Sequence, residues 1–140
     1  MFSHKFLLFV TLAFCLETLS VYADIDAMTA AINQMSQECG KELGIDPEKV
    51  KEFKWDVDYE PCFLNCFYTK YGMLNKGIFD KEKAMDYAKL YVTDETVLAQ
   101  IKETNEDCTK VNDIDIGDGD TSCKRAALLY KCISSHEGVV

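Results

Sequence analysis

The stretch Cys62-Phe63-Leu64-Asn65-Cys66 places two cysteines four positions apart, in a segment that begins at Pro61. In a helix each residue turns about 100°, so Cys62 and Cys66 share one face and lie one turn apart. Two thiols placed in this way can bind one metal ion together, or each can form a disulfide with a different partner. The rest of the sequence has to decide between these two arrangements.

The first 23 residues have the pattern of a secretory signal peptide. The apolar run Phe6–Leu16 is ended by Glu17, well short of the roughly 20 apolar residues that a membrane span needs. Val21-Tyr22-Ala23 then places small residues at the positions that a signal peptidase reads. We expect a secreted protein without a membrane span, with one mature domain over residues 24–140; a buried N-terminal helix is the alternative.

Six cysteines remain once the signal peptide and its Cys15 are removed. In an oxidising compartment such thiols pair. His136 is then the one remaining histidine, and it belongs to no C-x2-C or H-x3-H arrangement. We therefore expect three disulfides and neither a metal ion nor another cofactor, although six cysteines still allow fifteen pairings.

The chain is acidic, with a formal net charge of −9 at pH 7, and contains no run of basic residues. Nucleic acids and anionic membrane surfaces are therefore poor partners. An acidic, solvated surface keeps a small secreted protein soluble.

Periodicity and capping residues predict an all-α domain of about six helices without a convincing strand. The predicted helices are 27–39, capped by Asp26, with a tail that ends at Gly44; 47–54, opened by Asp46-Pro47; 61–74, opened by Pro61; 81–91, capped by Asp80; 95–108, capped by Asp94; and 122–133, capped by Asp120 or Thr121. Apolar side chains cover most of the last helix, which predicts that it is central. Cys123 and Cys132 point to opposite sides of it, so we expect them to anchor it to two different neighbours.

The spacing of the six cysteines resembles that of the insect odorant-binding proteins of the pheromone- and general-odorant-binding type. The six cysteines are separated by 22, 3, 41, 14 and 8 residues. Three residues between the second and third cysteines and eight between the fifth and sixth are the family's hallmark. The stretches from Cys62 to Leu74 and from Cys123 to Ile133 also resemble its third and last helices, and the likeness covers the whole mature chain.

The resemblance implies how the cysteines pair. Carried over to this sequence, the family's pattern gives Cys39–Cys66, Cys62–Cys123 and Cys108–Cys132. Cys62 and Cys66 would then tie one helix to two others.

The resemblance also implies an internal apolar cavity that carries small volatile hydrophobic molecules, with delivery to a chemosensory membrane receptor as a monomer or weak dimer. Family lining positions on the third helix correspond to Leu64, Tyr68 and Thr69, and on the last helix to Ile133. Ala126 and Leu129 share a face with Ile133. From the residues alone, the apolar arc of Phe63, Phe67, Tyr71 and Leu74 could line the cavity or be ordinary core, and Leu98 and Ile101 are further candidates.

The sequence lacks residues that a calcium-binding loop or a catalytic site would require. The acidic turn that starts at Asp113 has Asp118 where a calcium loop needs glycine and Lys124 where it needs glutamate. Catalysis is not expected, because His136 has no Asp partner within a helix and no Gly-x-Ser-x-Gly stretch occurs. His136 could change charge near pH 6 to 7 or be an uninvolved surface residue. The alternative function is that of a saposin-like lipid-interacting protein or a helical signalling protein.

Overall fold

The computed structural model describes residues 25–117 and 121–136. The predicted signal peptide, the mature N-terminal residue Asp24, Asp118 of the rejected calcium loop and the predicted cap Asp120 all lie outside the described residues.

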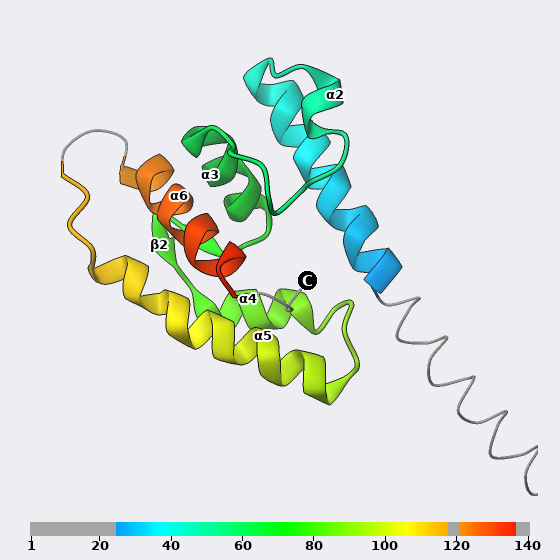
Figure 1. The fold of residues 1–140 in the computed structure, drawn as a ribbon, viewed down its shortest axis with the longest axis vertical. Coiled ribbons are helices and arrows are strands. Elements are labelled where there is room, and N and C mark those ends of the chain that lie inside the picture. The colour runs from blue at the N-terminus through cyan, green and yellow to red at the C-terminus, as the bar shows by residue number, and fades with distance from the viewer. Residues whose placement is uncertain (1–24, 118–120, 137–140) are drawn as a thin grey trace, which may run out of the picture.

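The described residues form six α-helices, a 3-10 helix and one short hairpin, which confirms the predicted all-α class (Figure 1). The elements are the N-terminal helix over residues 25–43, α2 Pro47–Val50, α3 Pro61–Lys70, β1 Leu74–Asn75, β2 Ile78–Phe79, α4 Lys81–Ala88, α5 Glu95–Cys108, η1 Thr109–Asp113 and α6 Thr121–Ser134. None of the described helices is long and apolar enough to cross a bilayer.

Most of the predicted helix starts are confirmed. The carboxylates of Asp46, Asp80 and Asp94 accept hydrogen bonds from the backbone N–H groups of the first turns of α2, α4 and α5, at 2.9 to 3.1 Å. Such bonds satisfy donors that have no partner within the helix. The predicted cap at Asp26 is wrong, because the backbone is already helical at residue 25.

The predicted helix over 61–74 ends earlier, and a hairpin follows it. Leu74 pairs with Phe79 and Asn75 with Ile78 in antiparallel register. The two loop residues Lys76 and Gly77 both have positive φ, at 50° and 76°, as a type I′ turn requires. The prediction of no strand was therefore wrong at this point. The helices predicted over 47–54 and 81–91 likewise end early, at Val50 and Ala88.

The core is built around α6, as the sequence predicted. This helix contacts α3, α5, η1 and β2, and Figure 1 shows it lying beside α3. Phe63, Leu64 and Phe67 of α3 are buried, as are Ala126 and Leu129 of α6. Since α6 contacts four other elements and makes its largest contact with α3, its apolar surface is the centre about which the domain folds.

Three disulfides tie the helices together, in the pairs that the resemblance implies. Cys39–Cys66 joins the N-terminal helix to α3, Cys62–Cys123 joins α3 to α6, and Cys108–Cys132 joins α5 to α6. The cysteines of the Cys62–Cys66 stretch thus reach two different helices, and no metal ion is needed to explain their spacing.

Aromatic packing fixes the irregular segment between α2 and α3. Phe53 stacks on Phe67 of α3 with ring centroids 4.2 Å apart, and Trp55 stacks on Tyr130 of α6 at 5.9 Å. The Tyr130 hydroxyl donates to the carbonyl oxygens of Val57 and Lys54, at 2.7 and 3.1 Å. Burial raises the pKa of Tyr130 to about 12, so this hydroxyl stays a donor at physiological pH.

Candidate ligand pocket

An apolar pocket of about 90 Å3 lies among the N-terminal helix, α3, α4, α5 and the end of α6. Among the described residues its lining contains no Asp, Glu, Lys, Arg or His. The lining residues are Met28, Ile32, Trp55, Phe67, Tyr68, Tyr71, Met73, Ala84, Tyr87, Ala88, Ile101, Thr104, Asn105 and Ile133. Apolar and aromatic walls with a few polar groups are typical of small-molecule sites.

The structure brings five of the sequence-predicted ligand residues to this pocket. They come from the second half of α3 and its C-terminal end, from α5 and from the end of α6, and are Phe67, Tyr68, Tyr71, Ile101 and Ile133. The pocket therefore lies at the C-terminal ends of α3 and α6, away from the Cys62–Cys123 bridge at their N-terminal ends.

The other seven candidate ligand residues do not line this pocket: Phe63, Leu64, Thr69, Leu74, Leu98, Ala126 and Leu129. Leu64 of α3 and Ala126 and Leu129 of α6 are almost completely buried, and these two helices contact each other. Leu74 is buried in β1, Thr69 is exposed and Leu98 is half-buried. Helical periodicity alone does not separate a core position from a lining position on the same face.

Sequence reasoning missed nine lining residues: Met28, Ile32, Trp55, Met73, Ala84, Tyr87, Ala88, Thr104 and Asn105. Ala84 and Ala88 are one turn apart on α4, and such a pair of small residues is a signal that a helix leaves space beside it. Trp55 offers no such signal, because it lies in an irregular segment whose path depends on tertiary packing.

Three tyrosines form a ladder at one side of the pocket. The rings of Tyr71 and Tyr87 have centroids 4.0 Å apart, and Tyr91 follows Tyr87 at 5.3 Å. Burial raises the pKa of the Tyr71 and Tyr87 hydroxyls well above the usual range. These rings therefore present neutral, polarisable surface at physiological pH.

Three buried polar atoms of lining residues have no hydrogen-bond partner among the described residues. They are the hydroxyl oxygens of Tyr68 and Tyr87 and the Asn105 amide nitrogen Nδ2. Tyr68 is 0% and Asn105 4% exposed. Burial raises the pKa of Tyr68 well above its ordinary value, so its hydroxyl keeps its proton.

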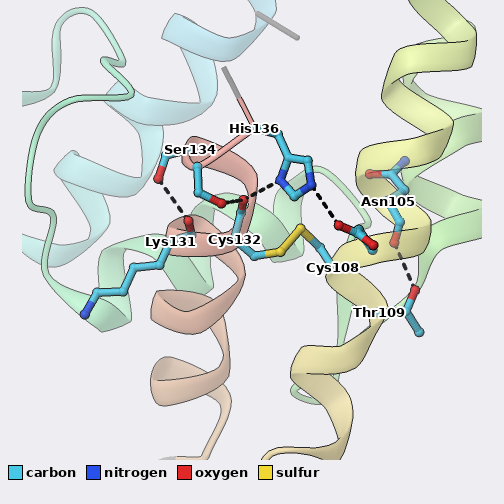
Figure 2. Close-up of a disulfide and its surroundings, with 9 residues drawn as sticks. Asn105, Cys108, Thr109, Lys131, Cys132, Ser134 and His136 are labelled. Carbon is cyan, nitrogen blue, oxygen red and sulfur yellow. Dashed lines mark hydrogen bonds and ion pairs between the residues drawn. A yellow bond between two sulfur atoms is a disulfide. The ribbon is translucent and has the colours of Figure 1, made fainter. Parts of the chain in front are cut away.

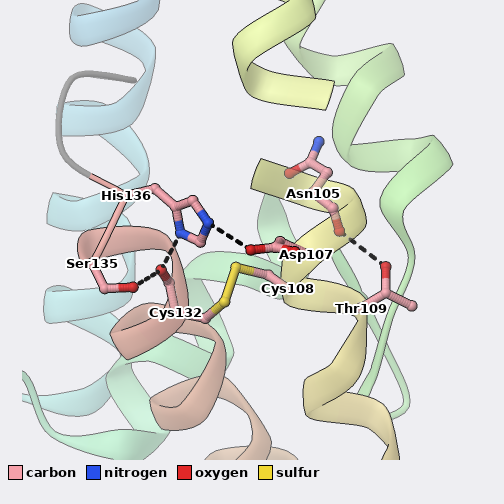
Figure 3. A network of polar contacts seen from close by, with 7 residues as sticks. All are labelled: Asn105, Asp107, Cys108, Thr109, Cys132, Ser135 and His136. Carbon is pink, nitrogen blue, oxygen red and sulfur yellow. Dashed lines mark hydrogen bonds and ion pairs between the residues drawn. A yellow bond between two sulfur atoms is a disulfide. The ribbon is translucent and has the colours of Figure 1, made fainter. Parts of the chain in front are cut away.

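His136 connects the end of α6 to α5 beside this region. Figure 3 shows its ring between the Cys132 carbonyl oxygen, 2.8 Å from Nδ1, and the Asp107 carboxylate, 3.1 Å from Nε2. Both partners are acceptors, so both ring nitrogens donate only in the imidazolium form. The Cys132 carbonyl, and after it Asp107, raise the pKa of His136, while Lys110 opposes them. His136 is thus engaged in a contact instead of being an uninvolved surface residue.

The sulfur atoms of Cys108 and Cys132 lie close to the His136 ring (Figure 2). Within the described ranges this is the group whose ligand-type atoms lie close enough together for a metal ion. However, both sulfur atoms are joined in the Cys108–Cys132 disulfide, and metal binding requires thiolates. This cluster is therefore a structural bridge.

A larger hollow of about 840 Å3 lies along residues 44–60 and Phe63, but its chemistry differs. Its lining includes the charged side chains of Asp46, Glu48, Lys49, Glu52 and Asp58. A groove with so many charges keeps its water and offers little apolar surface to a hydrophobic molecule. We therefore assign the candidate site to the smaller, uncharged pocket.

The fold and the pocket define a small all-α protein whose helices are held by three disulfides around uncharged, aromatic surface. The chain belongs to the PBP/GOBP family, which matches residues 22–136. It is 27% identical to general odorant-binding protein 2 of Antheraea pernyi, over 80% of this chain and 75% of that protein. It is 24% identical to general odorant-binding protein 56a of Drosophila melanogaster, over 73% of this chain and 70% of that protein. No solved structure matches the chain significantly.

Proposed function

We propose that the protein is an extracellular carrier that binds small apolar or amphipathic molecules, such as odorants, in the uncharged pocket. The observation that carries this proposal is the lining itself, in which the described residues are aromatic, aliphatic or neutral polar and include no carboxylate or amine. Membership of the PBP/GOBP family and the names of both relatives support the same function.

Burial of apolar surface supplies the affinity in this proposal. Each Å2 of apolar ligand surface removed from water contributes about 25 cal/mol. The pocket, at about 90 Å3, is smaller than the roughly 150 Å3 of an apolar cavity that holds benzene. Larger ligands must therefore displace side chains, and Met28 and Met73 are suited to this because the methionine side chain is flexible.

Secretion belongs to the same proposal. The signal-peptide pattern of residues 1–23 and the three disulfides fit a protein that folds in an oxidising compartment. Delivery of the ligand to a chemosensory membrane receptor, by a monomer or weak dimer, completes the proposed role.

Fluorescence of Trp55 tests the carrier function directly. Trp55 is the single tryptophan of the chain and lines the pocket, so titration with 1-octanol, which does not absorb near 280 nm, should change its emission saturably. Ala88→Phe should abolish the change, because Ala88 is buried and lines the pocket. Ala99→Phe on the exposed surface of α5 is the matched control and should bind as the wild type does.

Vesicle binding distinguishes the saposin-like alternative. A carrier should stay in solution with vesicles of phosphatidylcholine and phosphatidylserine while it binds 1-octanol. Co-sedimentation with the vesicles, together with no saturable response of Trp55, would favour a lipid-interacting protein instead.

A further inference from the structure

The polar groups of the pocket restrict which ligands it can accept. Asn105 lies on α5, Tyr68 on α3 and Tyr87 on α4, so the residues that carry the three unpartnered polar atoms line the same pocket from three different helices. Figure 3 shows the Asn105 amide pointing away from the Thr109 hydroxyl, which donates at 2.9 Å to the backbone carbonyl of Asn105. The side-chain amide is therefore not engaged in this local contact of α5.

A buried amide N–H without a partner is costly, because it has given up its hydrogen bonds to water. The Asn105 nitrogen can only donate, whereas the Tyr68 hydroxyl can donate or accept. A ligand that satisfies Asn105 must therefore present an acceptor atom. Asn105 and Tyr68 line the same small pocket, and an oxygen with two lone pairs can accept from both donors.

The charge of the lining restricts the ligand further. A carboxylate in this pocket would find no Lys, Arg or His among the described lining residues, and an ammonium group would find no Asp or Glu. Burial of an unpaired ion is strongly unfavourable. A pure hydrocarbon would be tolerated by the apolar walls but would leave Asn105 and Tyr68 unpartnered.

We propose that the pocket selects compact, neutral molecules that carry a carbonyl oxygen, with Asn105 Nδ2 as the principal donor and the Tyr68 hydroxyl as the second. This inference rests on the proposed carrier function and specifies its ligand class. Ketones and aldehydes with a small apolar or aromatic body satisfy both donors and fill the space between the aromatic walls.

A pair of ligands with the same shape tests the proposal. Acetophenone and α-methylstyrene differ in that a C=O group replaces a C=CH2 group, and calorimetric titration gives the affinity of each. Asn105→Leu should weaken acetophenone binding about tenfold relative to α-methylstyrene, because the variant removes the donor and keeps the bulk of the side chain. Gln100→Leu, an exposed amide on the same helix, is the matched control and should leave the ratio of the two affinities unchanged.

The outcomes separate the two proposals. If both ligands bind and Asn105→Leu leaves the ratio of affinities unchanged, carbonyl selection by Asn105 is overturned while the carrier function stands. If neither these ligands nor 1-octanol binds to the wild type, the carrier function fails, and the inference that rests on it fails as well.

Infrared spectroscopy of the wild-type protein gives a second readout that does not depend on a variant folding. The stretch of a 13C-labelled acetophenone carbonyl should lie at lower wavenumber in the complex than in hexane, since a hydrogen bond weakens the C=O bond. A C=O stretch of the bound ligand at the same wavenumber as in hexane would overturn the proposal. A shift that is present in the wild type and lost in Asn105→Leu would identify Asn105 as the hydrogen-bond donor.

Discussion

At the scale of single residues, neighbouring positions on one helix have different tasks. Leu64 and Phe67 are three positions apart on α3 and both are buried, yet Phe67 lines the pocket and Leu64 belongs to the core outside it. On α6, Leu129 belongs to the core and Ile133, one turn later, reaches the pocket. The same enlargement should therefore have opposite effects at Leu64 and Ile133.

Ile133→Trp should fill the pocket and leave the fold intact. Space beside the Ile133 side chain accommodates part of the indole ring, so we expect the 1-octanol affinity to fall at least tenfold, which is about 1.4 kcal/mol. Calorimetric titration measures the affinity, and thermal unfolding should show a melting temperature close to that of the wild type.

Leu64→Trp is the matched variant in the core. Leu64 is 1% exposed and does not line the pocket, so the indole ring should overpack the α3–α6 contact and cost about 1 to 3 kcal/mol of unfolding free energy. Equal losses of stability in Ile133→Trp and Leu64→Trp would contradict the assignment of Ile133 to a pocket.

His136 should make the stability of the fold depend on pH. Its pKa in the folded protein is raised above the ordinary value of 6.5. The protonated ring therefore stabilises the fold fully below pH 6.5, and this contribution is lost as the pH rises through the raised folded pKa. The wild type should exceed His136→Gln in melting temperature by more at pH 5.5 than at pH 8.5.

Asp107→Asn is the control for this pH effect. It removes the carboxylate that accepts from Nε2, so it should reduce the pH dependence in the same direction as His136→Gln. Parallel melting curves of the wild type and both variants across this pH range would show that the contact does not contribute to stability.

At the scale of the elements, the sequence predicted where helices begin better than where they end. The caps at Asp46, Asp80 and Asp94 are local signals, because side chain and backbone lie within one turn. The end of α3 is local as well, because Gly72 has a positive φ of 73° and the Gly72 and Met73 N–H groups donate to the Thr69 and Tyr68 carbonyl oxygens, at 3.0 and 2.9 Å. The hairpin that follows depends on a distant partner, since the Asn112 side chain of η1 holds the backbone of Phe79 in β2 through two hydrogen bonds of 2.9 Å. A contact across 33 positions leaves no periodic trace in the sequence.

Gly77→Ala should destabilise the protein more than Gly44→Ala. Both glycines have positive φ, at 76° and 67°, and alanine at such an angle costs about 1 to 2 kcal/mol. An added Cβ at Gly77 would also lie 3.2 Å from the Ser122 Cα atom at the start of α6, whereas at Gly44 it would meet no atom within 4 Å. Urea unfolding should show an additional loss of about 1 to 3 kcal/mol for Gly77→Ala, and equal losses would contradict close packing of the hairpin on α6.

At the scale of the whole molecule, helical periodicity and capping residues predicted the all-α class, and the cysteine spacing predicted the family resemblance. The pocket, in contrast, depends on how five helices meet. Trp55 and Asn105 show this limit, because one lies in an irregular segment and the other reads as an ordinary polar helix residue. They line the same pocket only because segments that are far apart in the sequence pack together. The three disulfides restrain the N-terminal helix, α3, α5 and α6, but α4, which supplies Ala84, Tyr87 and Ala88 to the wall, contains no cysteine.

We therefore predict that α4 is the wall that moves when a ligand enters. The resting pocket of about 90 Å3 has to enlarge for most ligands, and displacement of a helix without a disulfide requires the least distortion of the cross-linked shell. Hydrogen–deuterium exchange of the free protein should show faster exchange for the amides of α4 than for those of α3 and α6. A saturating ligand at 100 times its Kd should then slow exchange in α4 by up to about 100-fold, because opening of α4 competes with binding of the ligand.

Ala88→Phe, with the same ligand added, is the control and should show no such protection. Exchange in α4 that is as slow as in α3, or protection confined to α3 and α6, would place the moving wall elsewhere.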